Sequence, residues 1–565
     1  MLPFSQKPLS KFSFFIFSFC VCQLVVLNSG FELDESLTYI WPLPSEFKSG
    51  NETLTVDPTL SLSVLGKGGD LKILREGFER YKKIIFKHVS GVSIFEKWIG
   101  IRSVYDISEL RIIVNSDSEE LQLGVDESYT LSVAKNDGKS IVGEATIEAN
   151  TVYGALRGLE VSRQIIYLYT ELVTWYTVGT FSQLCAFDYG TKSVQVYKAP
   201  WYIQDKPRFA YRGLLLDTSR HYLPIDVIKQ IIESMSYAKL NVLHWHIIDE
   251  QSFPLEVPTY PDLWKGSYTK WERYTVEDAS EIVSFAKMRG IHVMAEVDVP
   301  GHAESWGAGY PDLWPTSSCR EPLDVSKNFT FDLISGILSD IRKIFPFELF
   351  HLGGDEVNTD CWTSTPHIKQ WLNNRNMTAK DAYQYFVLKA QEMAISKGWT
   401  PVNWEETFNA FASNLNPRTV VHNWLGPGVC PKAVAKGFRC IFSNQGVWYL
   451  DHLDVPWDQV YNAEPLEGIN NVSEQNLVLG GEVCMWCETA DTSNVQQTIW
   501  PRAAAAAERL WSKREPVSAR NITLTALPRY QYFRCLLNRR GVQAAPATNK
   551  YARSPPNGPG SCYEQ

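Results

Sequence analysis

The sequence predicts an α/β protein, in which a (β/α)8 TIM barrel follows a small N-terminal α/β domain of the α+β sandwich type. Eight short apolar runs recur in the second part of the chain, and segments with apolar residues at i, i+3 and i+4 lie between them. Eight strand-then-helix units over about 330 residues are typical of a barrel with insertions in its loops. In the first part of the chain, strand-like runs alternate with helical stretches in a different rhythm, which predicts a separate domain.

The elements of the N-terminal domain come first. Strand-like runs lie at 111–114 and 129–133, and a helical stretch lies at 71–86. The segment KAPWYIQDKPRF (198–209) contains two prolines and a charged pair, which indicate a linker. We therefore expect the barrel to begin directly after it.

The predicted barrel strands are short apolar runs, each followed by a polar loop. They are RGLLLD (212–217), NVLHWHIID (241–249), GIHVMAEVD (290–298), FELFHLGG (347–354), TPVNW (400–404), TVVHNW (419–424), RCIFSN (439–444) and VLGGEVCMW (478–486). Helices are predicted between them, for example at 225–240, 275–290 and 381–396.

The N-terminus is typical of a secretory signal peptide. Lys7 and Lys11 precede an apolar run (12–27), and small residues follow it. Because the apolar run is slightly long, an uncleaved signal anchor is the alternative. The predicted parts of the chain are a signal peptide (1–30), an N-terminal domain (31–205) and a barrel with a C-terminal helix and tail (206–565).

Composition restricts the partners. The chain has 565 residues and a formal net charge of −9 without a basic stripe, so we expect no nucleic-acid partner. Its 19 Trp and 26 Tyr make a carbohydrate ligand a hypothesis, because flat aromatic faces stack on sugar rings. Five N-x-S/T sequons suit a glycosylated product of the secretory pathway; they lie at Asn51, Asn328, Asn376, Asn471 and Asn521.

The stretch HLGGDE (351–356) places Asp355 and Glu356 side by side after an apolar run and two glycines. Alone, it would be an exposed turn, since Asp and Glu are mostly exposed. In a barrel it falls at the carboxyl end of the fourth strand, where such folds build active sites. We expect further acidic, basic and aromatic residues at the same face: Arg212, Asp217, Asp249, His302, Trp404, Glu405, Trp424, Tyr449, Asp451, Trp486 and Glu488.

Metal-dependent, nucleophilic and redox chemistries fit these residues less well. The motif HWH (244–246) points two histidines to one side of a strand, but the neighbouring strand ends carry Trp rather than further His and Asp ligands. Hydrogen-bonding or packed histidines are therefore favoured, and we expect neither a metal nor a cofactor. The sequence contains no H-E-x-x-H and no G-x-S-x-G, and CMWC (484–487) is more typical of a buried pair or a disulfide than of a redox or zinc site.

Glycoside hydrolysis fits a rim of acids and aromatics better. The ordinary retaining mechanism needs two carboxyls about 5–5.5 Å apart, usually from separate strands. An adjacent pair indicates a different division of roles: Glu356 would be the general acid, and Asp355 would act on another part of the substrate.

The chain resembles glycoside hydrolase family 20, the β-N-acetylhexosaminidases, and is especially similar to the plant members. The resemblance covers about 38 to 565. The motifs that carry it are RGLLLDTSRHYLP (212–224), NVLHWHIID, AEVDVPGHAESWG (295–307), HLGGDEVNTDCW (351–362), GGEVCMW and WPRAAAAAERLW (500–511).

The resemblance implies exo hydrolysis of terminal non-reducing GlcNAc and GalNAc residues. The nucleophile would be the substrate's own 2-acetamido carbonyl oxygen, and the intermediate an oxazolinium ion. Asp355 would hold the acetamido N–H, and Glu356 would act as acid and then as base. The other roles implied are a clamp on sugar hydroxyls (Arg212), a supporting polar shell (Asp249, His302, Glu488), pocket walls (Trp404, Trp424, Trp486), a donor to the acetamido oxygen (Tyr449) and a negative charge that disfavours sulfated sugars (Asp451).

Nine cysteines follow the predicted signal peptide, and the odd count leaves at least one unpaired in an oxidising compartment. The resemblance implies the disulfides Cys319–Cys361 and Cys535–Cys562, and Cys430–Cys440 is a further candidate pair. Cys487 stands where the family has Gly, so its side chain is expected to crowd the pocket at Trp486 or Glu488.

The segment VSRQIIYLYTELVTWYTVG (161–179) also departs from the family, and we interpret it as an insertion from a retained intron or an error in the gene model. A barrel that binds carbohydrate but has impaired catalysis is the alternative function. The expected partners are glycans with terminal GlcNAc or GalNAc, such as N-glycans and chito-oligosaccharides, and a second copy of the chain in a homodimer. The expected location is the secretory pathway, in the vacuole or outside the cell.

Overall fold

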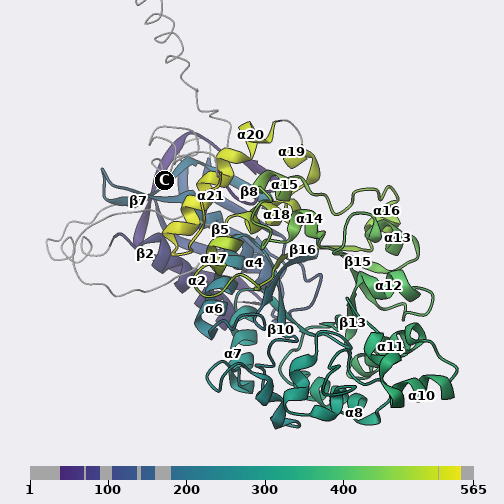
Figure 1. Cartoon of the computed structure of the whole chain (residues 1–565). Helices are drawn as coiled ribbons and strands as arrows, with labels where there is room; N and C mark the ends of the chain where they lie inside the picture. Colours follow the sequence, from purple (N-terminus) through teal and green to yellow (C-terminus); the bar gives the residue numbers. More distant parts are fainter. Residues whose placement is uncertain are drawn as a thin grey trace, which may run out of the picture.

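The computed structural model describes residues 38–68, 71–89, 105–136, 141–159, 180–518 and 521–548 (Figure 1). The predicted signal peptide and the predicted insertion 161–179 lie outside the described residues, as does Cys562. No helix among the described residues is long and apolar enough to span a membrane.

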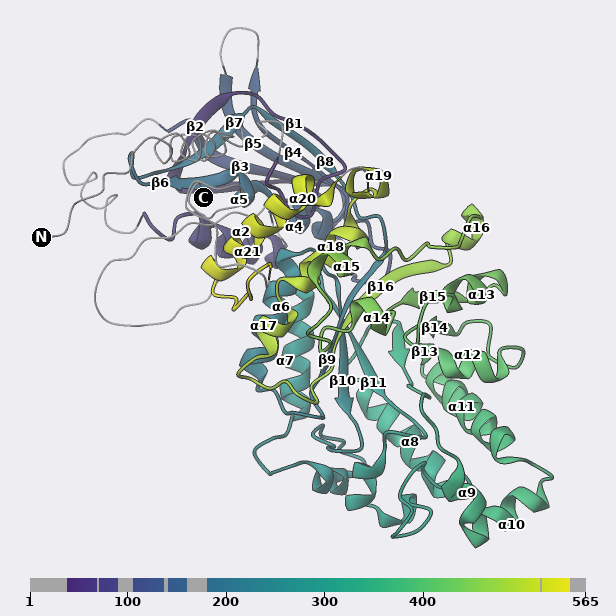
Figure 2. The same ribbon diagram turned by 45° about the horizontal axis from the view of Figure 1, so that its top comes forward.

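An eight-stranded mixed sheet forms the N-terminal domain, in the order β1-β8-β4-β5-β3-β2-β7-β6. The strands are β1 (Glu46–Lys48), β2 (Glu52–Gly66), β3 (Ile107–Val114), β4 (Tyr129–Asn136), β5 (Ile141–Ala149), β6 (Cys185–Asp188), β7 (Ser193–Ala199) and β8 (Trp201–Asp205). Helices α2 (Lys72–Ile85), α4 (Val152–Leu159) and α5 (Thr180–Leu184) cover the face of the sheet that looks toward the barrel (Figure 2). The strands and the helix predicted for this domain are confirmed as β3, β4 and α2.

The segment predicted as a linker is instead part of the sheet. Trp201–Asp205 forms β8, which pairs with β1 and β4, and its side chains alternate between buried and exposed. This alternation is the pattern of a strand with one covered face, and it outweighs the prolines at either end of the segment.

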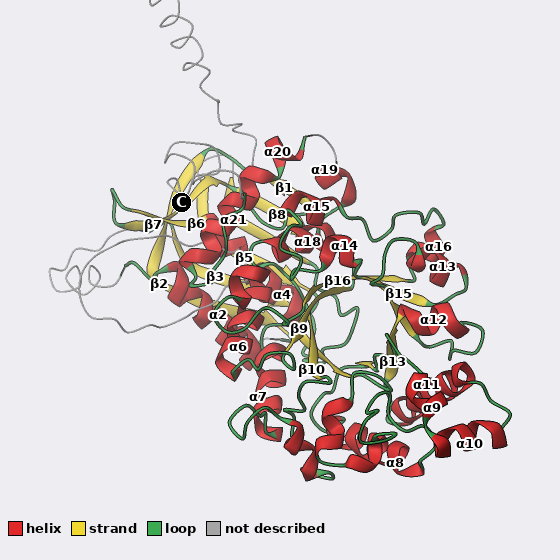
Figure 3. Ribbon diagram, in the orientation of Figure 1, coloured by secondary structure: helices red, strands yellow, loops and turns green. Residues whose placement is uncertain are grey.

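Eight parallel strands close the barrel (Figure 3). They are β9 (Tyr211–Asp217), β10 (Val242–Ile248), β11 (His292–Val297), β12 (Leu349–His351), β13 (Thr400–Trp404), β14 (Val420–His422), β15 (Arg439–Phe442) and β16 (Val478–Met485). All eight strand predictions are confirmed. The runs read as continuously apolar because a parallel barrel strand is buried on both faces.

Helices cover the outside of the barrel. The longer ones are α6 (Ile225–Tyr237), α7 (Val276–Lys287), α8 (Asn328–Ile341), α11 (Ala379–Ser396) and α18 (Arg502–Trp511). Short helices follow the later strands: α12 (Glu405–Phe411), α13 (Val429–Ala435), α14 (Gln445–Trp448), α15 (Trp457–Asn462) and α16 (Val472–Gln475). The loop after β12 adds α9 (Asp360–Ser364) and α10 (Pro366–Asn374), and the chain ends with α17 (Val495–Ile499), α19 (Arg514–Ser518), α20 (Ile522–Thr525) and α21 (Leu527–Arg539).

The interior of the barrel is filled in three levels. The amino ends of the strands contribute an apolar cluster that includes Tyr211, Met294 and Ile441. Histidine and glutamate side chains fill the middle level, and the carboxyl ends carry an aromatic cluster around Trp404 and Tyr449. The polar middle level separates the apolar base from the functional face.

A buried ion-pair cluster joins the two domains. The Glu127 carboxylate contacts Arg157 Nε at 2.7 Å and Arg212 Nη2 at 2.7 Å, and Arg157 also donates to the carbonyl of Gly290 in the barrel. Burial opposes the charge of Glu127, but the two guanidinium groups outweigh it and lower the carboxyl pKa to about 2. The Arg212 side chain, which is 0% exposed, therefore lies at the interface with the N-terminal domain.

Candidate active site

The two adjacent acids lie just beyond the end of β12. Gly353 and Gly354, which precede them, have φ angles of +60° and +92°, and a Cβ on Gly353 would meet Asp298 Oδ1 at 1.8 Å. The Gly354 N–H donates to the same oxygen at 2.8 Å. Only glycine allows this turn, which brings Asp355 and Glu356 out of the strand onto the carboxyl face of the barrel.

His302 lies between the acids and Asp249. Its Nε2 is 3.6 Å from Asp355 Oδ2 and 3.5 Å from Glu356 Oε2, and its Nδ1 is 3.0 Å from Asp249 Oδ1. The second Asp249 oxygen lies 2.7 Å from His246 Nε2. The structure thus brings together Asp249, His302, Asp355 and Glu356, as the sequence predicted.

Charge and burial set the protonation of these groups. Burial opposes a charge on His302, but Asp355 and Asp298 outweigh it and raise the histidine pKa well above its usual value. The hydrogen bond from His302 lowers the pKa of Glu356, whose side chain is 60% exposed. Burial raises the pKa of Asp298 well above its usual value, and the neighbouring Asp355 charge raises it further. These directions favour the protonated forms of His302 and Asp298 and the ionised form of Glu356.

Arg212 is not part of this group, and the prediction that it clamps sugar hydroxyls is wrong. It is the second residue of β9, at the opposite end of the strand from Asp217, and it binds Glu127. Arg220 occupies the carboxyl face instead, with Nη2 2.8 Å from Asp249 Oδ2 and Nη1 3.8 Å from Glu488 Oε1.

The sequence contained a signal for Arg220. Both arginines fall in the motif RGLLLDTSRHYLP, but only Arg220 follows the strand, and barrel active sites use the residues that follow strands. Asp217, which the sequence placed at this face, orients Arg220 by accepting from its backbone N–H at 3.1 Å and lies 3.3 Å from its Nη1.

Four aromatic side chains form one wall. Trp404, Trp424, Tyr449 and Trp486 belong to a single contact cluster with Leu215 and Cys484. The rings of Trp424 and Tyr449 are nearly parallel, 11° apart with centroids at 6.3 Å, and Trp486 lies 6.1 Å from Tyr449. The guanidinium of Arg220 lies 5.0 Å from the centre of the Trp486 ring, which joins the wall to the polar groups.

Sequence reasoning missed Glu406. Its Oε2 accepts from the Trp424 Nε1–H at 2.9 Å, so it fixes the orientation of one wall residue. Burial, followed by the charge of Asp355, raises the pKa of this carboxyl to about 8. The sequence motif NWEETF placed Glu405 at the rim, but Glu405 instead accepts from the backbone N–H of Trp424 at 2.9 Å and is buried.

Two predicted site residues lie at the edge of the cluster. Asp451 is near His452, with 3.7 Å between Oδ2 and the histidine Nε2, and burial raises the pKa of its carboxyl. Glu488 has a side chain that is 54% exposed, and among the described residues its ion pair is with Arg220.

Cys487, which was expected to crowd the pocket at Trp486 or Glu488, belongs to the core of the barrel domain. Its side chain is fully buried in the large core cluster, its N–H donates to Asp217 Oδ2 at 3.0 Å, and its carbonyl contacts His221 Nδ1 at 2.6 Å. Its backbone does not have a positive φ, so a Cβ is accommodated without strain. Cys484 and Cys487 are both free and buried, and Cys484 Sγ lies 3.0 Å from Ser443 Oγ.

The histidines of the HWH motif hydrogen-bond inside the barrel. His244 Nδ1 lies 2.8 Å from Glu482 Oε1, and His246 Nδ1 lies 2.5 Å from Glu296 Oε2. Both point to the barrel interior, as expected from their i, i+2 spacing.

Two predicted disulfides are present, Cys319–Cys361 and Cys430–Cys440. The pair Cys535–Cys562 includes a residue outside the described part and stays a prediction. The five sequon asparagines are all exposed; they are Asn51, Asn328, Asn376, Asn471 and Asn521.

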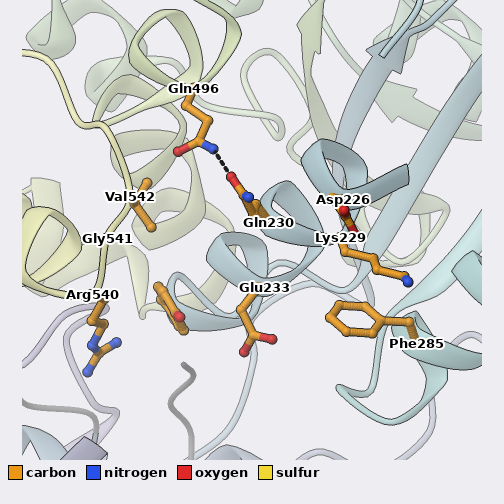
Figure 4. A pocket seen from close by; sticks show the side chains of 10 residues that line it. Asp226, Lys229, Gln230, Glu233, Phe285, Gln496, Arg540, Gly541 and Val542 are labelled. Atoms are coloured by element: carbon orange, nitrogen blue, oxygen red, sulfur yellow. Dashed lines mark hydrogen bonds between the residues drawn. The ribbon is translucent and has the colours of Figure 1, made fainter. Parts of the chain in front are cut away.

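A separate pocket of about 260 Å³ lies on the outside of the barrel (Figure 4). It is lined by α6, by Phe285 of α7 and by residues after α21, and the Gln496 amide donates to Gln230 across one side. It contains none of the predicted site residues.

The fold and the site define a class of protein. A barrel that gathers a carboxyl pair, a bridging histidine, an arginine and an aromatic wall at its carboxyl face is built to bind a sugar and protonate a leaving oxygen. This is the site of a glycoside-cleaving barrel enzyme.

Comparisons with known proteins agree. The model of the glycosyl hydrolase family 20 catalytic domain matches residues 209–514, and a model described as beta-acetyl hexosaminidase like matches 40–165. Beta-hexosaminidase 1 of Arabidopsis thaliana is 73% identical over 533 residues, which cover 94% of this chain and 95% of that protein. The human beta-hexosaminidase subunit beta is 34% identical over 534 residues, covering 90% and 88%. The solved structure of Flavobacterium johnsoniae chitobiase has a TM-score of 0.73 and 28% identity, covering 90% of this chain and 73% of that one.

The chain belongs to glycoside hydrolase family 20 and is a β-N-acetylhexosaminidase of the plant type. The alternative of a carbohydrate-binding barrel with impaired catalysis is not favoured, because the curated relatives that the chain matches over most of its length are beta-hexosaminidases.

Proposed function

We propose that this enzyme removes terminal non-reducing GlcNAc and GalNAc residues from glycans with retention at the anomeric carbon, using the substrate's acetamido group as nucleophile. The observation that carries this proposal is Asp355 Oδ1, a buried carboxylate oxygen without a hydrogen-bond partner among the described residues. A buried acceptor is costly unless it is paired. The acetamido N–H of a bound sugar supplies the missing donor.

In the first step the acetamido carbonyl oxygen attacks the anomeric carbon. Asp355 holds the N–H and stabilises the positive charge that spreads over the new ring. Glu356 gives its proton to the glycosidic oxygen, which leaves as an alcohol. The product of this step is a bicyclic oxazolinium ion.

In the second step Glu356 takes a proton from water, and the water oxygen attacks the anomeric carbon from the side that the leaving group vacated. The ring opens and the acetamido group is restored. His302 lies 3.5 Å from Glu356 and is held by Asp249, so the charge on Glu356 is balanced between the steps.

The remaining residues bind the sugar. Arg220 takes the role of hydroxyl clamp that the sequence assigned to Arg212, because it is the guanidinium beside Asp249 and Trp486. Trp404, Trp424 and Trp486 enclose the ring and the acetamido methyl, and Tyr449 donates to the acetamido oxygen. N-glycans and chito-oligosaccharides are the substrates proposed.

The test compares aryl N-acetylglucosaminides with aryl glucosides, which lack the acetamido group, and follows the anomer of the released sugar by NMR. Turnover of the first class alone, a β-anomer as first product and tight inhibition by a thiazoline that mimics the oxazolinium ion are expected. A glycosyl group trapped covalently on any carboxylate would overturn the mechanism.

The cellular setting is also proposed. Residues 1–30 act as a cleaved signal peptide and direct the enzyme to the secretory pathway, where its destination is either the vacuole or the extracellular space; the exposed sequons suit this route. We further propose a homodimer. N-terminal sequencing of the mature protein and light scattering test these two points.

A further inference from the structure

One carboxylate in the barrel interior contacts residues that lead both to the general acid and to the aromatic wall of the active site. Glu296, on β11, is 0% exposed and has four nitrogen neighbours. Its Oε2 lies 2.5 Å from His246 Nδ1 and 3.1 Å from His244 Nε2. Its Oε1 lies 2.8 Å from His351 Nδ1 and accepts from the Trp404 Nε1–H at 3.0 Å.

The first arm leads from Glu296 to the general acid. The Nδ1 atom of His246 contacts the Glu296 carboxylate, and its Nε2 atom lies 2.7 Å from Asp249 Oδ2. Asp249 Oδ1 then lies 3.0 Å from His302 Nδ1, and His302 Nε2 lies 3.5 Å from Glu356 Oε2. Carboxylate and imidazole alternate along this line, so each group fixes the proton position of the next.

The second arm leads to the aromatic wall. Trp404 is 1% exposed, and its indole N–H is held by Glu296. The centre of the Trp404 ring lies 6.2 Å from the centre of the Trp486 ring. The Trp486 ring also contacts the guanidinium of Arg220. The Glu296 carboxylate is therefore connected to the aromatic wall as well as to the general acid.

We propose that Glu296 is a positioning residue that couples the chain of hydrogen-bonding groups leading to Glu356 to the aromatic wall. Its one buried charge then sets both the proton position on the His302–Glu356 pair and the orientation of the Trp404 ring. It acts only through His246 and Trp404 and touches no substrate. The inference rests on the proposed acid role of Glu356.

The negative charge of Glu296 determines the protonation of the groups between His246 and Glu356. Two carboxylates flank His246, which favours its doubly protonated form and gives Asp249 a cationic neighbour. Without the Glu296 charge, His246 becomes neutral, Asp249 loses that neighbour, and the potential at His302 becomes more negative. The proton on the His302–Glu356 pair is then released at higher pH. The titratable groups facing Glu296 are His244 and His246 of β10, His351 of β12, His422 of β14, Tyr211 of β9, Cys484 of β16 and Asp298 beyond β11.

The chain supplies a matched control. Glu482, on β16, is also 0% exposed and also pairs with His244, through Nδ1 at 2.8 Å. Its other oxygen accepts from the Tyr211 hydroxyl at the apolar base of the barrel. It has the same burial and chemistry as Glu296, but it contacts neither His246 nor Trp404.

The experiment compares Glu296→Gln with Glu482→Gln in the full-length enzyme. For Glu296→Gln we expect a kcat roughly tenfold lower, with a larger loss for poor leaving groups, a raised KM and an alkaline limb of the pH profile shifted upward. For Glu482→Gln we expect a similar fall in Tm but a kcat within about twofold of wild type and an unchanged pH profile. Equal kinetic losses in the two variants, or an unshifted profile in Glu296→Gln, would overturn the inference.

Two further variants keep the result decisive. If Glu296→Gln does not fold, His246→Gln removes only the acid-side arm, and the same leaving-group bias and upward shift are expected from it; their absence also overturns the inference. Glu356→Gln is measured in parallel. If Glu356→Gln shows no dependence on the leaving group, the acid assignment fails; if it does and the Glu296 and His246 variants do not, only the coupling fails.

Discussion

Arg220 and Asp249 form an ion pair at the carboxyl face of the barrel, with 2.8 Å between Nη2 and Oδ2. The pair holds the guanidinium beside Trp486, where a sugar hydroxyl can reach it. Arg212, eight positions earlier in the same motif, ends at the opposite side of the barrel. Strand β9 therefore separates an arginine at the carboxyl face, which we propose binds the sugar, from one that joins the two domains.

Replacing these two arginines should give opposite phenotypes. Arg220→Ala is expected to raise KM and lower kcat/KM about 100-fold, because a charged hydrogen-bond donor to the sugar is lost, with little change in Tm. Arg212→Ala should lower Tm, because buried Glu127 keeps one guanidinium instead of two, and should leave KM unchanged. Steady-state kinetics and thermal unfolding of both proteins check this. A KM effect in Arg212→Ala would restore the original assignment.

The adjacent acids should differ in their dependence on the leaving group. Glu356→Gln is expected to lose about 10²–10⁴-fold in kcat for natural glycans and much less for activated aryl glycosides, which need no protonation. Asp355→Asn should lose activity on both, because it stabilises the charged intermediate. A Brønsted series of aryl N-acetylglucosaminides measures the difference. Equal losses on all substrates in Glu356→Gln would contradict the acid role.

Glu406 should make stability depend on pH. Its folded pKa is raised to about 8, first by burial and then by Asp355, so the folded state binds the proton more tightly than the unfolded state. The contribution is fully present below the unfolded carboxyl pKa of about 4.5 and is lost as pH rises through about 8. Glu406→Gln keeps an acceptor for the Trp424 indole N–H. Its Tm should therefore fall less than the Tm of the wild type as the pH rises from 5 to 8. Parallel Tm curves for the two proteins would refute this.

Cys487→Gly should act on stability rather than on catalysis. The sulfur packs in the core, so its removal is expected to cost about 1–2 kcal/mol of unfolding free energy and to leave kcat/KM unchanged. Cys487→Ala is the control, because it removes the thiol without adding glycine flexibility. Denaturant unfolding and kinetics measure both effects. A rise in kcat/KM would show that the thiol does crowd the pocket.

Asp451 should discriminate against anionic sugars. Like charges repel, so neutral terminal GlcNAc should have a higher kcat/KM than 6-sulfated GlcNAc. Burial raises the pKa of Asp451, so the preference should grow as pH rises and the carboxyl ionises. The ratio of the two kcat/KM values at two pH values tests this, with Asp451→Asn as control. A ratio of one in wild type at both pH values would exclude the effect.

Local patterns in the sequence were sufficient for the barrel and for the acid pair. The eight strands were predictable because a parallel strand buried on both faces must be apolar along its whole length. Asp355 and Glu356 were predictable because Gly353 and Gly354 mark a turn at a strand end. The Trp201–Asp205 strand was hidden, because its partners β1 and β4 lie elsewhere in the sequence and the flanking prolines resemble a linker.

The sequence by itself thus determined the fold class, the family and the position of the acid pair at a strand end, since each depends on short-range spacing along the chain. Only the tertiary structure decided which arginine faces the substrate, where the Cys487 sulfur points and which interior carboxylate joins His246 to Trp404. These outcomes depend on contacts between residues far apart in sequence, such as Glu127 with Arg212 and Glu296 with Trp404. A side chain's partner is set by closure of the barrel and by docking of the first domain, and neither leaves a local pattern in the chain.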